Sequence, residues 1–264
     1  MKKEIYEKIH KEYLKHDSLC MLYELGHIVL GGLMYRTYAP PIYLPDNKRK
    51  FVYIVNPKVA NSSIKASIMG TDKIEDNGAI HRMVKKQVIH RWRKKYDSYY
   101  KFTFVRNPFE RMVSCYVHRY QAPEKWIGKK NSYKYYLFGY IKNVNGFDEF
   151  VRKTCKIPDR LMDIHFKPQY LLIYDRGRIS VDFVGRYENL NEDWKVVQKK
   201  HQLKNLPHLN QGKKKNWMDF YTRELADIVY ERYKNDFELF GYQDEYVKLL
   251  EYLEQKDRIY AERT

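Results

Sequence analysis

The sequence FVYIVNPKVANSSIKASI, residues 51–68, decides the fold expected for this chain. It opens with a run typical of a buried β-strand, Phe51–Val55, and it closes in a helix expected over Ser62–Met69 and ended by Gly70. The turn between these elements holds Lys58 and small polar side chains. A strand, a short polar turn and a helix N-terminus are together typical of an anion site. The turn lacks the glycines of a nucleotide-binding P-loop, so the kind of anion is open at this point.

A second strand-to-helix junction follows in KFTFVRNPFERMVSCYVHRY, residues 101–120. The strand is expected over Lys101–Val105, and the helix has strong start signals. Asn107 can act as its N-cap, Pro108 suits the first helical position, and Glu110 completes a capping box. Two strands, each followed at once by a helix, predict an α/β fold with a central parallel sheet flanked by helices.

The two junctions offer matching groups for a ligand with two anionic ends. Neighbouring parallel strands end at the same edge of a sheet, and ligands of such sheets bind there. The second junction contributes Arg106 at the strand end and Ser114 two turns into the helix. The first junction contributes side chains and backbone amides of six consecutive residues: Lys58, Val59, Ala60, Asn61, Ser62 and Ser63. We therefore expect one ligand with two separated phosphate-like groups.

Three further segments accompany the junctions: HFKPQ at 165–169, DFVGRYENLNEDW at 182–194 and NDFELFGY at 235–242. In this order, the five segments resemble carbohydrate sulfotransferases that use 3′-phosphoadenosine 5′-phosphosulfate (PAPS), the Golgi-type chondroitin and uronosyl enzymes among them. FTFVRNPFERMVSCY carries the most specific likeness, because it resembles the family's 3′-phosphate segment closely. The resemblance covers about residues 51–242 and implies a three-layer fold like that of P-loop NTPases.

The resemblance implies that PAPS donates the sulfuryl group and that PAP is the product. Sulfuryl transfer is then an in-line displacement in which positioning and charge stabilisation do most of the work. Lys58 is placed to meet the negative charge that grows on the bridging oxygen between sulfur and phosphorus. Arg106 and Ser114 would hold the 3′-phosphate. No metal is required by this chemistry, and the sequence has no cluster of metal ligands.

The segment LNQGKKKNWMDFYT, residues 209–222, is a third candidate contact with the donor. It looks like the segment with glycine and lysine that closes over the 3′-phosphate in sulfotransferases. Lys213, Lys214 and Lys215 are the candidate ligands. A run of solvated lysines accounts for the same residues equally well.

The acceptor hydroxyl needs a general base, and histidines between the two cofactor segments are the first candidates. His81 follows a short apolar pair and reads as a residue at a strand end, the place where similar glycan enzymes carry a base. His90 lies in a basic amphipathic stretch and is the second candidate. His165 or a carboxylate remains a third option.

The charge of the chain favours acidic partners. Fifty Lys and Arg against 33 Asp and Glu give a formal net charge of +17, which suits the donor and an anionic glycan acceptor alike. A basic nucleic-acid-binding protein without catalysis is one alternative, with VKKQVIHRWRKK at 84–95 as its patch. A P-loop-like kinase is another, although GxxxxGK[ST] is absent.

The resemblance implies a sulfotransferase domain over residues 46–264, and the residues before it, 1–45, are expected to form an N-terminal helical extension. The proline-rich stretch 39–49 reads as a linker between them. The apolar stretch 19–35 contains Glu24 and is too short to span a bilayer, so it reads as a core or docking segment, with peripheral membrane contact as the second interpretation.

The compartment is predicted from three features. The sequence shows no signal peptide and no membrane anchor, and its three cysteines form no disulfide framework: Cys20, Cys115 and Cys155. A reducing, cytoplasmic location is therefore expected.

Overall fold

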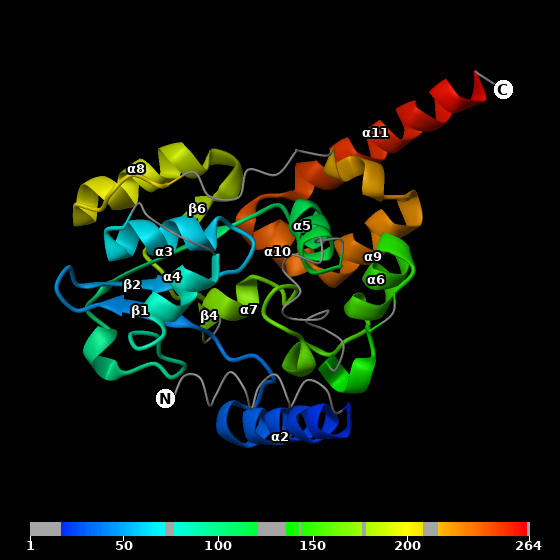
Figure 1. Cartoon of the computed structure of the whole chain (residues 1–264). Coiled ribbons are helices and arrows are strands. Elements are labelled where there is room, and N and C mark those ends of the chain that lie inside the picture. The colour runs from blue at the N-terminus through cyan, green and yellow to red at the C-terminus, as the bar shows by residue number, and fades with distance from the viewer. Residues whose placement is uncertain are drawn as a thin grey trace. The chain divides into compact units, whose positions relative to one another are not determined.

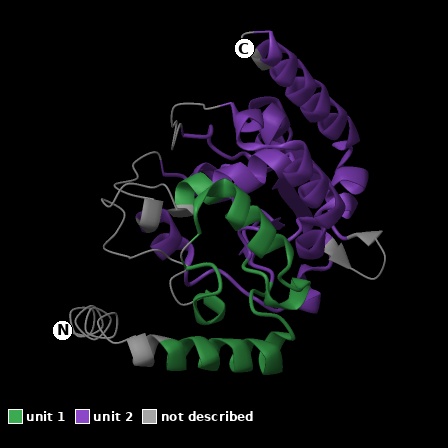
Figure 2. Cartoon of the chain, turned by 90° about the vertical axis from the view of Figure 1, so that its right-hand side faces the viewer, with its two compact units in different colours: residues 1–40, 116–163 green, residues 41–115, 164–264 purple. Residues whose placement is uncertain are grey.

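The structure is a computed structural model, and it forms two compact units (Figures 1 and 2). Unit 1 comprises residues 1–40 and 116–163, and unit 2 comprises residues 41–115 and 164–264. The residues that the structure describes are 17–71, 77–120, 136–142, 144–175, 178–207 and 216–262.

Unit 2 holds the main sheet and most of the helices that the structure describes; Figure 1 labels these elements. Its first half contains β1 Tyr43–Asp46, β2 Phe51–Ile54, α3 Asn61–Met69, α4 Asn77–Val84, η1 Lys94–Tyr96, β3 Tyr100–Val105 and the start of α5 Pro108–Tyr120. Its second half contains α7 Tyr170–Ile173, β4 Tyr174–Asp175, β5 Arg178–Ile179, β6 Phe183–Arg186, η5 Tyr187–Asn189, α8 Leu190–His201, η6 Trp217–Phe220, α9 Arg223–Arg232, α10 Lys234–Phe240 and α11 Gln243–Ala261.

The main sheet has the strand order β1-β2-β3-β6. β2, β3 and β6 run parallel, which confirms the predicted α/β fold. β1 pairs antiparallel with β2 through the register Leu44↔Tyr53, so the sheet is mixed. The linker expected over residues 39–49 is therefore wrong at Tyr43–Asp46. Its prolines suggested a linker, but Pro45 is tolerated because β1 is the edge strand of the sheet.

One face of the sheet carries a closely packed apolar core. Alternate residues of β2 and β3, such as Phe51 and Phe102, pack against Ile64 of α3 and Trp194 of α8. Figure 1 shows α3 and α8 over this face of the sheet. β6 can approach β3 closely because it carries Gly185, where a Cβ would lie 2.3 Å from the Phe104 ring. The other face is covered in part by Tyr96 and Tyr99, which pack on Val52.

The helix boundaries at both junctions follow the sequence signals. α3 ends at Gly70, which has the left-handed φ of 68° typical of a glycine cap. α5 begins at Pro108, and the Phe109 N–H donates to Asn107 Oδ1 over 3.0 Å, which confirms Asn107 as the N-cap. The capping box is wrong: the carboxylate of Glu110 binds Arg106 instead.

Unit 1 contains α2 Asp17–Tyr35, the last turn of α5, η3 Tyr136–Gly139, α6 Gly146–Cys155 and η4 Asp159–Leu161. No helix in the described part of the chain is both long and apolar enough to cross a bilayer. The first part of the predicted N-terminal helical extension, residues 1–16, lies outside the described residues.

Candidate functional site

The loop between β2 and α3 has the backbone shape of an anion cradle. Two of its residues adopt positive φ angles, Lys58 at 73° and Ala60 at 60°. These turns leave the N–H groups of residues 59–63 without a hydrogen-bond acceptor among the described residues, and the first intrahelical bond runs from Ile64 N–H to Ala60 O. Consecutive free amides at a helix start, next to a lysine, form a site for a tetrahedral oxyanion.

The side chains of the first helical turn are not equivalent. Asn61 Oδ1 accepts a hydrogen bond from the buried Tyr53 hydroxyl over 3.3 Å, so its side chain serves the core. Ser63 is buried, whereas Ser62 and Lys58 are half-buried. Asn61 is half-buried as well, but the Tyr53 hydroxyl occupies its side-chain oxygen. Among the predicted loop ligands, Ser62 and Lys58 are therefore the best placed to offer side-chain groups, while Asn61 and Ser63 contribute backbone amides.

Arg106 joins the two predicted junctions. Its Nη1 donates to the backbone carbonyl of Lys58 over 3.0 Å, and its Nη2 donates to Glu110 Oε1 over 2.6 Å. The guanidinium carbon lies 4.0 Å from the centre of the Tyr187 ring, a cation–π contact. Nε is buried and has no partner among the described residues. The predicted proximity of the two strand ends is therefore confirmed, and one donor of Arg106 is still unused.

A buried amide and carboxylate hold the strand ends in place. Gln169 bonds the Arg106 backbone in both directions, over 3.0 and 2.8 Å, and it also accepts from Asn56 Nδ2 over 2.9 Å. Asp236 accepts from the N–H groups of Gln169 and Tyr170. Burial raises the pKa of Asp236 to about 6, against the opposing effect of these hydrogen bonds. This network fixes the position of the Arg106 backbone at the end of β3.

Further polar links involve two of the segments that carry the family resemblance, DFVGRYENLNEDW at 182–194 and NDFELFGY at 235–242. Glu188 accepts from the Asn107 N–H over 2.7 Å and from the Tyr242 hydroxyl over 2.8 Å. Arg186 Nη2 donates to the Phe240 carbonyl over 2.6 Å. The sequence patterns of these two segments thus identify residues that support the strand ends.

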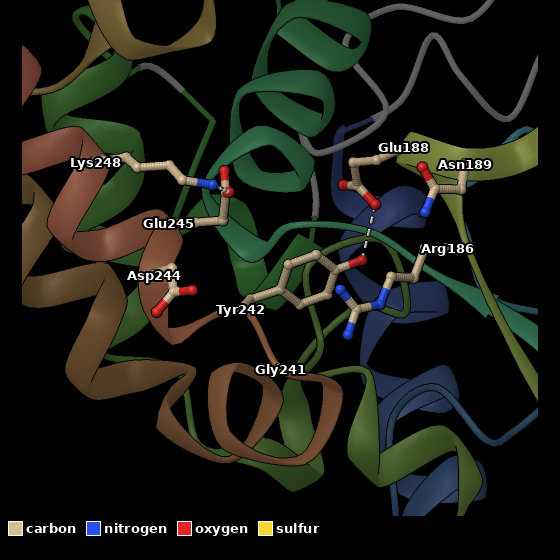
Figure 3. Close-up of a pocket in the computed structure, with 8 residues that line it drawn as sticks. All are labelled: Arg186, Glu188, Asn189, Gly241, Tyr242, Asp244, Glu245 and Lys248. Atoms are coloured by element: carbon tan, nitrogen blue, oxygen red, sulfur yellow. Dashed lines mark hydrogen bonds and ion pairs between the residues drawn. The ribbon is translucent and has the colours of Figure 1, made fainter.

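A cavity of about 200 Å³ lies beside these links (Figure 3). Carboxylates and cations both line it, and Figure 3 shows the Tyr242 hydroxyl turned towards Glu188. Lys248 is paired with Glu245 over 2.6 Å. Because three carboxylates and two cations line its walls, this cavity does not suit a multiply charged anion.

The structure describes only part of the remaining residues that are predicted to bind PAPS. Ser114 is half-buried on α5, one turn beyond Glu110 and so on the same helix face as that residue. Lys213, Lys214 and Lys215 lie outside the described residues.

The two candidate bases lie in different surroundings. His81 belongs to helix α4, so the expectation that it ends a strand is wrong. Its exposed ring places Nδ1 3.2 Å from Nζ of Lys65, a side chain that is only 4% exposed. Burial lowers the pKa of Lys65 to about 8. His90 is exposed, with Nδ1 3.3 Å from the Pro41 carbonyl.

Sequence reasoning missed three contributors to this site. Glu110 could have been found from its i, i+4 spacing to Arg106, a common ion-pair pattern. Lys65 reads as an ordinary surface residue of a short helix, but it is buried in the structure, where α3 packs against α4. Tyr187 has no local signal, because its contact with Arg106 depends on the β3–β6 pairing.

Comparison with known proteins agrees with this geometry. The chain matches the sulfotransferase family over residues 42–243, which include both junctions. It is 26% identical to carbohydrate sulfotransferase 14 of Danio rerio over 261 residues, covering 85% of this chain and 69% of that protein. It is 23% identical to carbohydrate sulfotransferase 10 of Xenopus laevis, covering 77% and 67%. It is 26% identical to human carbohydrate sulfotransferase 9, covering 76% and 53%.

No solved structure gives a significant match. The family match nevertheless spans most of the chain, and the loop and strand ends that it includes are those that form the anion cradle. The chain belongs to the sulfotransferase family.

Proposed function

We propose that this protein transfers a sulfuryl group from PAPS to a hydroxyl of a carbohydrate. One observation carries the proposal: the amides of residues 59–63, without acceptors in the described structure, adjoin Lys58 and are tied through Lys58 to Arg106. This arrangement presents one cradle for the 5′ end of the donor and one cation for its 3′ end.

Lys58 and the loop amides would act on the departing nucleotide. Bound PAPS would supply an activated sulfuryl group. Transfer of that group to the acceptor leaves negative charge on the 5′-phosphate of the departing nucleotide. The ammonium group of Lys58 and the N–H groups of residues 59–63 would stabilise that charge in the transition state. Because Arg106 binds the Lys58 carbonyl, the N–H groups of the loop are oriented before PAPS binds.

Arg106 and Ser114 would bind the 3′-phosphate. The unused Nε of Arg106 fits this role, since it is a buried donor without a partner among the described residues. Glu110 occupies Nη2, so a phosphate would compete with this carboxylate for the guanidinium group. Lys213, Lys214 and Lys215 remain proposed additional ligands.

His81 is the proposed general base, with His90 as the alternative. The base must accept the proton of the acceptor hydroxyl at Nε2, because Nδ1 faces Lys65. A neutral Lys65 amine can accept a hydrogen bond from the Nδ1–H group of His81, and in that tautomer Nε2 carries a lone pair. A charged Lys65 donates to Nδ1 instead and forces the proton onto Nε2. Lys65 therefore decides whether His81 can act as a base.

The acceptor class is proposed from two features. The matched relatives are named carbohydrate sulfotransferases, and the net charge of +17 suits an anionic glycan. A cytoplasmic location stays a prediction from the sequence.

The test is transfer of radiolabelled sulfate from PAPS to a panel of glycans. We expect label in at least one glycan and a fall in kcat of about 100- to 1,000-fold in Lys58→Ala, the usual effect of losing one such donor. Lys195→Ala is the matched control, since Lys195 is exposed and paired with Glu192 on α8. Salt-sensitive DNA binding without any response to PAPS or PAP would contradict the proposal and favour the nucleic-acid alternative.

A further inference from the structure

Helix α2 of unit 1, drawn in green in Figure 2, exposes large apolar side chains to solvent between Met21 and Met34. Leu33 is 78% exposed and Leu22 is 64% exposed, values that are rare for leucine in a folded helix. The same surface includes Leu25, Val29 and Leu30. We call these five residues the α2 face.

The α2 face is part of an apolar arc that covers more than half of the helix circumference. At about 100° per residue, the exposed side chains between Met21 and Met34 extend over roughly 220°. No Asp, Glu, Lys or Arg stands within this arc. The one charged residue between positions 21 and 35, Glu24, lies on the opposite side and is buried.

The inward side of α2 is fixed, so the helix cannot roll to bury its apolar arc. Glu24 accepts from the Leu137 N–H over 2.8 Å and from the Tyr38 hydroxyl over 3.3 Å. Gly31 lies so close to the following chain that a Cβ there would stand 2.9 Å from the Thr37 carbonyl oxygen. The orientation of the helix within unit 1 is therefore built into its contacts.

We infer that the α2 face binds the surface of an anionic lipid bilayer. A wide arc without any charge suits the acyl boundary of a bilayer, where an interfacial helix buries its apolar side. The net charge of +17 attracts the protein to anionic headgroups, and the absence of carboxylates from the arc removes local repulsion. Tyr23 stands 64% exposed in the arc, and tyrosine is enriched at the membrane–water boundary.

Other occupants of the α2 face fit less well. α2 does not meet the length and hydropathy of a spanning helix, so it would lie along the bilayer rather than cross it. Two copies of the chain repel each other at +17 each. In the sequence of residues 1–16, Ile5, Ile9 and Tyr13 recur at helical spacing and would form a single apolar stripe, which is too narrow to cover an arc of this width.

Vesicle sedimentation tests the inference without reference to enzyme activity. We expect the full chain to sediment with vesicles of phosphatidylglycerol and phosphatidylcholine, and much less with phosphatidylcholine alone. In Leu25→Glu/Leu33→Glu the partition coefficient should fall at least about tenfold. The variant loses two leucines that the bilayer would bury, and it gains two negative charges that the anionic headgroups repel. Leu239→Glu/Val247→Glu is the control, since it adds the same charge at exposed apolar positions of α10 and α11.

Four outcomes would overturn the inference. The first is no binding of the full chain to anionic vesicles. The second is equal binding by both double variants, which would leave net charge as the cause. The third is a dimer in light scattering that Leu25→Glu/Leu33→Glu dissociates, which would assign the face to a second copy. The fourth is a lower melting temperature in that variant alone, which would show that the chain itself covers the face.

Discussion

The guanidinium group of Arg106 donates to the backbone carbonyl of Lys58 across 3.0 Å. This bond connects the end of β3 to the loop after β2, two segments separated by 48 residues in the sequence. The loop amides of residues 59–63 and the guanidinium group therefore form one unit. Any change at Arg106 should alter the loop as well as the proposed 3′-phosphate contact.

Arg106→Lys should weaken binding of PAP by about 10- to 100-fold. A lysine keeps the charge but loses the planar fork that reaches the Lys58 carbonyl and a phosphate together, and a hydrogen bond to a charged group contributes about 1.5–3 kcal/mol. Isothermal titration calorimetry with PAP measures the effect. Arg223→Lys is the control, because Arg223 is exposed and pairs with Glu254 on the surface. Equal affinity in wild type and Arg106→Lys would remove Arg106 from the donor site.

Glu110→Gln should raise the affinity for PAP by a factor of about 3 to 10. Its carboxylate lies 2.6 Å from Nη2 of Arg106, so it competes with a phosphate for that donor and repels the phosphate charge. The ion pair is partly exposed, and its loss should cost about 1 kcal/mol or less of folding free energy. The same titration decides the matter: a weaker affinity would mean that Glu110 positions Arg106 for the ligand.

The sequence predicted the junctions well because their signals are local. Gly70 and Asn107 end and begin helices through contacts with their nearest neighbours, so each can be identified from a few residues. The parallel pairing of β2 and β3 followed from two consecutive strand–helix units. By contrast, β1 was read as a linker, because its four residues become a strand only when they pair with β2.

The details of the site could not be predicted, because they depend on packing between distant segments. Lys65 is buried by the contact between α3 and α4, and that contact also turns His81 towards it. Asn61 resembles a loop ligand in sequence, yet the Tyr53 hydroxyl in the core holds its side chain. Local patterns therefore identified which residues gather at this edge, but not which atoms face the ligand.

The turnover rate should rise with pH through about 8 if His81 is the base. Burial lowers the pKa of Lys65 to about 8, so below this pH the charged amine donates to Nδ1 and the proton of His81 sits on Nε2. Above it, the neutral amine accepts from Nδ1 and Nε2 can take the proton of the acceptor. In Lys65→Met this rise through about pH 8 should disappear, because the titrating amine is gone.

The profile is measured as kcat between pH 6 and pH 9.5 at saturating donor and acceptor. A flat wild-type profile from pH 7 to pH 9 would contradict the role of the Lys65–His81 pair. If His90→Ala removes the rise while His81→Ala leaves it in place, the base is His90. Equal KM values for the acceptor in wild type and Lys65→Met would show that the change lies in proton transfer rather than in binding.

Asp236→Asn should destabilise the fold without touching the donor directly. Both carboxylate oxygens of Asp236 accept backbone N–H groups, from Gln169 and Tyr170, and an asparagine offers only one oxygen to these two donors. An unsatisfied buried donor costs about 1–3 kcal/mol.

Because burial raises the pKa of Asp236 to about 6 in the folded protein, the folded state binds more protons than the unfolded chain between about pH 4 and pH 6. The wild type should therefore gain stability relative to the variant, by up to about 3 kcal/mol, as the pH falls from 7 to 4. Urea unfolding of both proteins at pH 7, 5.5 and 4 measures this difference, and a difference that stays constant or shrinks at low pH would show that the carboxyl group of Asp236 does not titrate in this range.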